Sequence, residues 1–227
     1  LAKLPLIPML VTPDGEAIFS FEFCKGEWQC TGHGPVLGKS GGWEPSLRKS
    51  GGYYWLHTRG HGQTGLLYRS GDGLNYEEHA RISLLSVPQA LNQCLDGSLY
   101  LASNPIPEPP GHWLRNPLVA FPLSGNHYGE PIVIHDDGGI RVDTADRIPF
   151  IDHAVSSNVF LGGVWRHLLF FRVCDLKERT PYSHQTELAR LIGTPKARQK
   201  SSGLYCAELH GEPCLLYTSP SPRDPSL

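Results

Sequence analysis

Two adjacent side chains, Asp152 and His153, are of the types that acid–base chemistry requires. An imidazole titrates near neutral pH and a neighbouring carboxylate can orient it, so such a pair can give and take a proton during a reaction. The same two residues also commonly cap the start of a loop. We predict Asp152 and His153 as candidate catalytic residues, with loop capping as the alternative.

His57 and Arg59 stand two residues apart in the aromatic run 53–59. Side chains two positions apart point to the same face of a β-strand, so both are expected to line one polar pocket. Tyr54 is a candidate stacking platform for a ligand bound there, as are Trp55 and Trp113. Ordinary packing between strands is the alternative for these aromatic side chains.

The composition argues against several classes of partner. Lys and Arg number 20 against 22 Asp and Glu, without a basic cluster, so no nucleic acid is expected to bind. No apolar run approaches the roughly 20 residues of a membrane helix. The 11 histidines lack a helical H-x-x-x-H spacing and no glycine-rich loop opens a helix, so we expect no metal and no cofactor. No leader-like segment follows Leu1, and the sequence predicts no compartment.

The elements that must position these residues are short strands. Of 227 residues, 25 are Gly and 20 are Pro. Aromatic and β-branched runs begin just after Gly15, Gly52, Gly97 and Gly163, which is typical of strands that follow turns. These glycines lie 37, 45 and 66 residues apart, against roughly 40–50 residues per propeller blade. We predict an all-β fold, a β-propeller of four-stranded antiparallel blades, with a β-sandwich as the alternative.

Each predicted unit contains up to four strands. First strands are expected at 7–11, 45–48, 88–93 and 154–160, second strands at 16–23, 53–59, 98–104 and 164–172, third strands at 66–70, 118–121 and 204–209, and fourth strands at 76–82 and 132–134. One helix is expected at 185–192, inside the long excursion 173–202. Excursions of this length often carry function.

The C-terminal residues 214–227 are predicted to be a non-native tail. Residues 214–224 resemble a translation of the adapter DNA used in sequencing libraries, as expected for a metagenomic fragment. The domain is then 1–213, an incomplete β-propeller whose natural sequence continues further. A natural Pro/Ser-rich tail is the alternative. The five cysteines before the tail show no metal spacing and are expected to be buried free thiols.

Trp43-Glu44-Pro45-Ser46-Leu47, then 51–59 and 67–76, resemble one blade of the sialidase (neuraminidase)-like superfamily of Asp-box (BNR repeat) propellers. Members of that family commonly show Glu-Pro-Ser, an Asp-Gly turn, an apolar strand ending in Arg, and a Ser-x-Asp-x-Gly-x-x-Trp box. Here the box at 70–76 is one residue short and ends in Tyr76 instead of Trp. The resemblance covers roughly residues 40 to 210, and five-bladed glycosidases share the same local pattern.

The resemblance implies a six-bladed propeller, truncated here, and a glycoside hydrolase of carboxylated sugars, with a five-bladed glycosidase-like fold as the alternative. Sialidases bind the sugar carboxylate with three arginines, because a planar guanidinium can form two parallel hydrogen bonds to it. Arg59, Arg115 and Arg172 each lie at or just beyond an apolar strand in different units. They are the predicted triad, and solvated strand-end arginines are the alternative.

The resemblance also implies a role for Glu44, which matches the Glu-Pro-Ser position and is predicted to act as base or nucleophile activator. Asp152 and His153 precede the analogous strand of a later unit, where the tyrosine expected of a sialidase is absent. Two other functions therefore stay open. One is a non-catalytic propeller that binds a glycan or a protein. The other is a five-bladed neutral-sugar glycosidase, which would need three inward carboxylates. A carbohydrate substrate is the expected partner.

Overall fold

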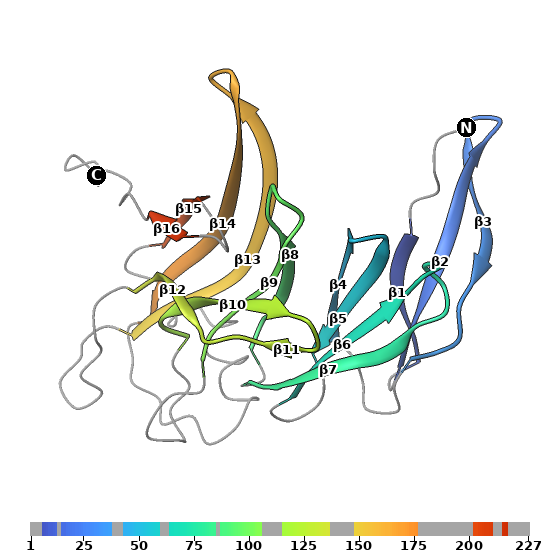
Figure 1. The fold of residues 1–227 in the computed structure, drawn as a ribbon, viewed down its shortest axis with the longest axis horizontal. Helices are drawn as coiled ribbons and strands as arrows, with labels where there is room; N and C mark the ends of the chain where they lie inside the picture. Colours follow the sequence, from blue (N-terminus) through green and yellow to red (C-terminus); the bar gives the residue numbers. More distant parts are fainter. Residues whose placement is uncertain are drawn as a thin grey trace. The chain divides into compact units, whose positions relative to one another are not determined.

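The computed structural model describes residues 6–12, 15–37, 43–59, 64–84, 87–105, 115–136, 148–176, 202–210 and 215–217. Every regular element in these ranges is a β-strand, and the strands pair antiparallel (Figure 1). The predicted all-β class is confirmed for this part of the chain. The predicted helix at 185–192 and Trp113 lie outside the described residues. In the ranges given, no helix has the length and apolar character needed to cross a membrane.

The strands are β1 (Leu6–Thr12), β2 (Gly15–Cys24), β3 (Glu27–His33), β4 (Trp43–Ser50), β5 (Tyr53–Arg59), β6 (Thr64–Ser70), β7 (Glu77–Ser83), β8 (Ala90–Gln93), β9 (Leu99–Ser103), β10 (Leu118–Ser124), β11 (His127–Tyr128), β12 (Ile132–His135), β13 (Ile148–Leu161), β14 (Val164–Leu176), β15 (Ser202–His210) and β16 (Leu215–Tyr217).

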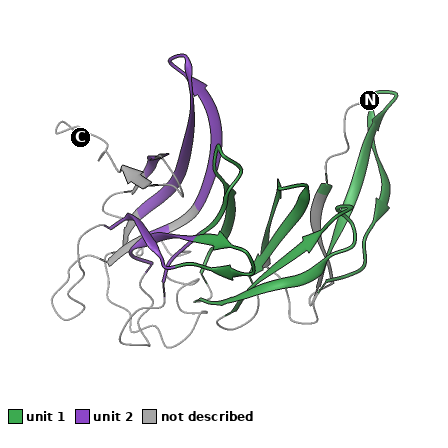
Figure 2. Cartoon of the chain, viewed as in Figure 1, with its two compact units in different colours: residues 1–101, 122–129 green, residues 102–121, 130–227 purple. Residues whose placement is uncertain are grey.

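These strands belong to two compact units, residues 1–101 with 122–129 and residues 102–121 with 130–227 (Figure 2). The first unit contains a sheet of order β1-β2-β3 and a sheet of order β4-β5-β6-β7. The second unit contains the sheet β13-β14-β15-β16. A further sheet, β11-β10-β9-β8 with β12 on β10, includes the strands in which the chain passes from one unit to the other.

Most predicted strands are confirmed, because apolar alternation and turn glycines define them clearly. One predicted strand start needs correction, and one seven-residue strand was missed. β13 begins at Ile148 instead of 154, so Asp152 and His153 lie inside a strand and do not cap a loop before it. The strand β3 was not predicted, because its sequence EWQCTGH is polar and its side chains are largely exposed.

The first unit is held together by two apolar clusters. Ile18, Leu56, Leu66 and Tyr68 form one of them, between the β1-β2-β3 sheet and the β4-β7 sheet. Leu67, Ala80, Leu91 and Leu99 form the other, on the side of β8 and β9. Because Leu66 and Leu67 are neighbours on β6, the two faces of the β4-β7 sheet are both covered, as in a blade packed between two others.

The first strands of successive sheets lie beside one another in this unit. The amide of Leu91 on β8 donates to Ser46 Oγ on β4 at 2.8 Å, and Gln93 Nε2 donates to the carbonyl of Lys49 at 2.8 Å. Strands β1 and β4 are also in contact. Adjacent first strands are the arrangement expected in a propeller. Closure of the sheets into a propeller, and the number of blades, stay predictions.

Three hairpins share a two-residue turn in which both residues are left-handed. The turns are Lys25-Gly26, Gly51-Gly52 and Gly162-Gly163, with φ between 54° and 88°. This backbone matches the twist of paired strands and is the type I′ geometry that favours Asn or Gly. Lys25 is the only one of these six turn residues that is not glycine, so its side chain stands at a position suited to glycine.

Lys25→Asn should therefore stabilise the protein. Asparagine tolerates the left-handed region better than lysine does, and we expect a gain of about 0.5–1 kcal/mol in the free energy of unfolding. Urea denaturation measured at neutral pH would test this. Gly26→Ala is the control of opposite sign, because it places a Cβ at a φ of 88°. A destabilised Lys25→Asn variant would contradict the strain argument.

The cysteines differ from the expectation of buried free thiols. Cys30 and Cys206 are free but exposed, and Cys24 is free and half-buried. Cys94 is disulfide-bonded. Within the predicted tail, the backbone of β16 pairs with β15, Leu216 opposite Leu209. The non-native origin of residues 214–227 stays a prediction.

Candidate functional site

A one-residue β-bulge at Glu44 presents this carboxylate to Arg59. Trp43 pairs with Arg59 and Ser46 pairs with His57. Between these two pairs β4 has two residues and β5 has only one, so β4 contains one extra residue. Glu44 has a φ of 55°, a left-handed conformation that costs a non-glycine residue roughly 1–2 kcal/mol. Pro45, which lacks an N–H, fits such an interruption of the ladder.

The bulge produces an ion pair with unequal exposure. Arg59 Nη1 lies 3.1 Å from Glu44 Oε2, and the side chains are 9% and 40% exposed. The Arg59 guanidinium is thus almost fully buried, whereas the Glu44 carboxylate is exposed to solvent. A carboxylate fixed at such an edge can take a proton from a bound molecule.

The same bulge recurs in the second unit. Asp152 pairs with Arg172 and Val155 pairs with Phe170, so β13 again contains one residue more than β14 between the two pairs. In the β13–β14 hairpin, Arg172 therefore occupies the position that Arg59 has in the β4–β5 hairpin, and His153 occupies the position of Glu44. Arg172 is exposed. The backbone register sets Asp152 directly across from Arg172.

Arg115 belongs to the second unit and lies against β13. Its carbonyl accepts a hydrogen bond from the amide of Ile151 at 3.0 Å, one residue before Asp152. Arg115 is buried, with 8% of its surface exposed. The following segment is fixed by buried Asn104, whose Nδ2 donates to the carbonyl of Pro117 at 3.0 Å. The structure brings Glu44 to Arg59 and the backbones of Arg115, Asp152 and Arg172 together. Convergence of all three arginines on one pocket stays a prediction.

His57 is fully buried and takes part in an internal network, which corrects the expectation that it lines a pocket. Its Nε2–H donates to Gln89 Oε1 at 2.8 Å, so Nδ1 is the acceptor for the Tyr128 hydroxyl at 3.1 Å. Burial lowers the pKa of His57 from 6.5 to about 4, against a smaller opposing effect of the Gln89 hydrogen bond. Burial likewise raises the pKa of Tyr128. The imidazole is therefore neutral, and both of its nitrogens are used inside the protein.

Gly65 makes room for this network. A Cβ added there would lie 2.6 Å from Gln89 Oε1 and 2.8 Å from His57 Cε1. Distances below 3.0 Å are not tolerated without a shift of the neighbours. The network thus depends on a residue without a side chain on β6, opposite Arg59 in the strand register.

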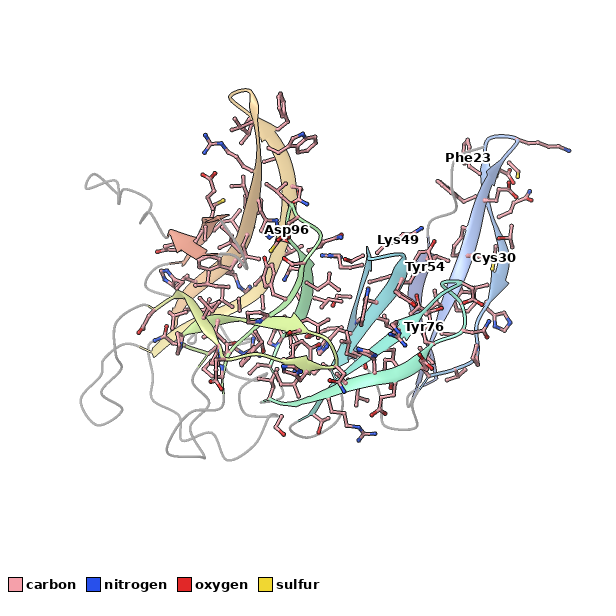
Figure 3. All side chains as sticks on the ribbon, viewed as in Figure 1. Phe23, Cys30, Lys49, Tyr54, Tyr76 and Asp96 are labelled. Atoms are coloured by element: carbon pink, nitrogen blue, oxygen red, sulfur yellow. The ribbon has the colours of Figure 1, made fainter. Side chains whose placement is uncertain are left out.

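Tyr54 lies away from His57 and Arg59. It alternates with them on β5 and so belongs to the opposite face of the sheet. Lys49 Nζ donates to the Tyr54 hydroxyl at 3.2 Å and stands 4.7 Å from the ring centroid (Figure 3). The ring also borders Gly73, where an added Cβ would come within 3.3 Å of it. The structure therefore does not bring Tyr54 to the bulge.

The turn between β6 and β7, which carries the box-like sequence, is fastened by Asp72. Its carboxylate accepts hydrogen bonds from the amides of Leu74 and Asn75, from Asn75 Nδ2 and from the Ser70 hydroxyl, at 2.7 to 2.9 Å. These donors, those of Asn75 foremost, hold the pKa of Asp72 well below 3.8. The turn is a structural device, and its carboxylate is fully engaged.

Several participants were not predicted from the sequence. Gln89 and Tyr128 stand far from His57 in the chain, and no local pattern marks them as its partners. The bulge at Glu44 had one signal, a proline inside a strand-like run. Among the described residues, no group of three or more His, Cys, Asp or Glu lies together as a metal site would require.

No protein-family model and no curated protein matches the sequence. The chain has weak similarity to two solved structures, both of glycoside hydrolases. One is a GH43 glycoside hydrolase engineered to display endo-xylanase and exo-arabinofuranosidase activity, with a TM-score of 0.41, 12% identity, and coverage of 92% of this chain and 42% of that one. The other, a glycoside hydrolase, has a TM-score of 0.37 and 10% identity, with coverage of 93% and 61%. The chain thus spans less than two thirds of either structure. At these scores the likeness decides neither blade number nor function.

Proposed function

We propose that the protein is a glycoside hydrolase of sialidase-like type that acts on a carboxylated sugar. Glu44 serves as base or nucleophile activator, and Arg59 with Arg115 and Arg172 binds the sugar carboxylate. The observation that carries the proposal is the Glu44–Arg59 pair, because a strained left-handed backbone maintains it.

The geometry at the bulge suits this chemistry. Arg59 Nη1 lies 3.1 Å from Glu44 Oε2, and the planar guanidinium is the group whose fork geometry matches a carboxylate. Glu44 is exposed enough to meet a ligand. The recurrence of the bulge at Arg172 supports the idea that the second unit contributes in the same way.

A substrate series tests the proposal. Purified protein should hydrolyse sialosides or uronate-containing glycans and leave the neutral analogues, in which a hydroxymethyl group replaces the carboxylate, largely uncleaved. Arg59→Ala should raise KM for the carboxylated substrate by at least about tenfold, because a charged hydrogen-bonded contact to a carboxylate is lost. The neutral analogue should be indifferent to this change.

Arg69→Ala is the matched control. Arg69 pairs with Glu77 at 2.9 Å on the same sheet, but the two residues are direct cross-strand partners and are more exposed. It should leave KM unchanged. Binding of the glycan without turnover would select the non-catalytic propeller instead. Cleavage of neutral substrates as efficient as that of carboxylated ones, with KM unchanged in Arg59→Ala, would select the neutral-sugar glycosidase.

A further inference from the structure

Strand β6 has no side chain directly across from Arg59. Arg59 on β5 pairs with Gly65 on β6. Directly opposite residues of an antiparallel pair project to the same face of the sheet, with Cβ atoms roughly 4.5–5.5 Å apart. A side chain at position 65 would therefore stand beside Arg59 and restrict its rotamers. Because this residue is glycine, the group that fills the space beside Arg59 has to come from elsewhere.

Gln89, from the segment before β8, fills that space together with His57. A Cβ added at Gly65 would lie 2.6 Å from Gln89 Oε1 and 2.8 Å from His57 Cε1, and both distances are shorter than real Cβ contacts. The amide of Gln89 and the ring of His57 thus stand where a cross-strand partner of Arg59 would have its side chain. All three side chains are buried. Gln89 therefore borders the space available to the Arg59 side chain on this face of the sheet.

The side chain of Gln89 is held in one orientation. Its Oε1 accepts the hydrogen bond from His57 Nε2–H at 2.8 Å, and the other nitrogen of this imidazole is engaged by the Tyr128 hydroxyl. The backbone that follows Gln89 is fastened to β4, because the amide of Leu91 donates to Ser46 Oγ at 2.8 Å. Ser46 comes directly after the bulge in β4. The same contacts therefore fix Gln89 relative to both β5 and the bulge.

We propose that Gln89 is a positioning residue that keeps the Arg59 guanidinium turned toward Glu44. Its amide excludes the Arg59 side chain from the space over Gly65, so the guanidinium extends to the bulge instead of folding back across β6. A side chain locked by its own hydrogen bonds can direct a neighbour without taking part in the reaction. All of these residues belong to the first compact unit. The inference rests on the proposed function, because it supports the arginine to which carboxylate binding is assigned.

Steady-state kinetics of Gln89→Leu test the proposal. Leucine keeps most of the volume but removes the amide, so the hydrogen bond that fixes residue 89 to His57 is lost. KM for the carboxylated substrate should rise about fivefold while kcat stays within about twofold of wild type, because a misdirected Arg59 weakens binding and leaves Glu44 in place. A KM equal to that of wild type would overturn the positioning role.

Gln93→Leu is the matched control. Gln93 also belongs to β8, and its Nε2 donates to a backbone carbonyl of β4, but at Lys49, toward the opposite end of that strand from the bulge. The substitution removes the same amide from the same strand. KM and kcat should both equal those of wild type. An equal rise of KM in Gln93→Leu would overturn the proposal, because general loosening of β8 would then explain the effect.

Nitrogen–proton NMR of the substrate-free protein separates failure of this inference from failure of the proposed function. The Arg59 Nε–H resonance, assigned by its absence in Arg59→Lys, should exchange with water at least about tenfold faster in Gln89→Leu than in wild type or Gln93→Leu. Gly65→Ala should have the same effect, because the added Cβ has to displace the Gln89 amide or the His57 ring. Slow exchange of Arg59 in both variants would overturn the positioning role. Accelerated exchange in a protein that hydrolyses no glycan would support it and would refute only the glycosidase.

Discussion

Acidification from neutral pH to pH 4 should lower the free energy of unfolding by about 3 kcal/mol through His57 alone. The pKa of this imidazole is about 4 in the folded protein and 6.5 for an exposed side chain, so the unfolded chain binds the proton more readily. The contribution of His57 is complete above pH 6.5 and is lost progressively as the pH falls toward 4. Protonation would also convert Nδ1 into a donor that faces the Tyr128 hydroxyl.

Urea denaturation at a series of pH values measures this effect. His57→Asn is the control, because it removes the titrating ring and should flatten the difference in stability between pH 6.5 and 4. The variant should also be less stable at neutral pH by about 2–4 kcal/mol, since Gln89 and Tyr128 lose buried hydrogen bonds and ring volume is left unfilled. Equal slopes in wild type and His57→Asn would show that other groups cause the acid sensitivity.

Glu44→Gln should reduce kcat for the proposed carboxylated substrate by about 100-fold or more, because a positioned carboxylate used for proton transfer typically contributes that much. The amide keeps the size of the side chain and the left-handed backbone, so the bulge should survive. Removal of the negative charge leaves Arg59 almost buried beside a neutral group, and we expect a loss of about 1–3 kcal/mol in the free energy of unfolding.

Glu77→Gln provides the comparison for this second prediction. It changes an equivalent carboxylate beside Arg69 that is 70% exposed, and both activity and stability should stay near those of wild type. A Glu44→Gln enzyme with unaltered kcat would remove Glu44 from the chemistry, although its ion pair with Arg59 would still be a structural contact.

The sequence was informative where periodicity and turn chemistry act locally. Gly52 and Gly163 each end a two-residue left-handed turn, and the strands on either side follow from the alternation of apolar and polar residues. The strand β3 was not predicted, because it lacks these local signals. Its exposed side chains carry no apolar alternation, and it forms because β2 offers a paired edge.

The site was less predictable, because it depends on register. Tyr54 was predicted at the same pocket as His57 and Arg59, although it stands three and five residues before them and so on the opposite face. Alternation also cannot tell that His57 is covered by Gln89 and Tyr128 from other strands. Nor does it reveal that one extra residue in β4 directs Glu44 to Arg59. Burial and bulges of this kind arise from tertiary pairing, which a single sequence does not display.

The equal offset of the hairpins at Glu44 and His153 has a consequence for how such a chain can grow. In both, the kink and the arginine across from it lie within one contiguous stretch, 43–59 in one case and 152–172 in the other. Duplication of the gene segment for one such hairpin would therefore copy the bulged strand and the arginine opposite the bulge together. Diversification of the copy then requires exchange of only one or two side chains at the kink.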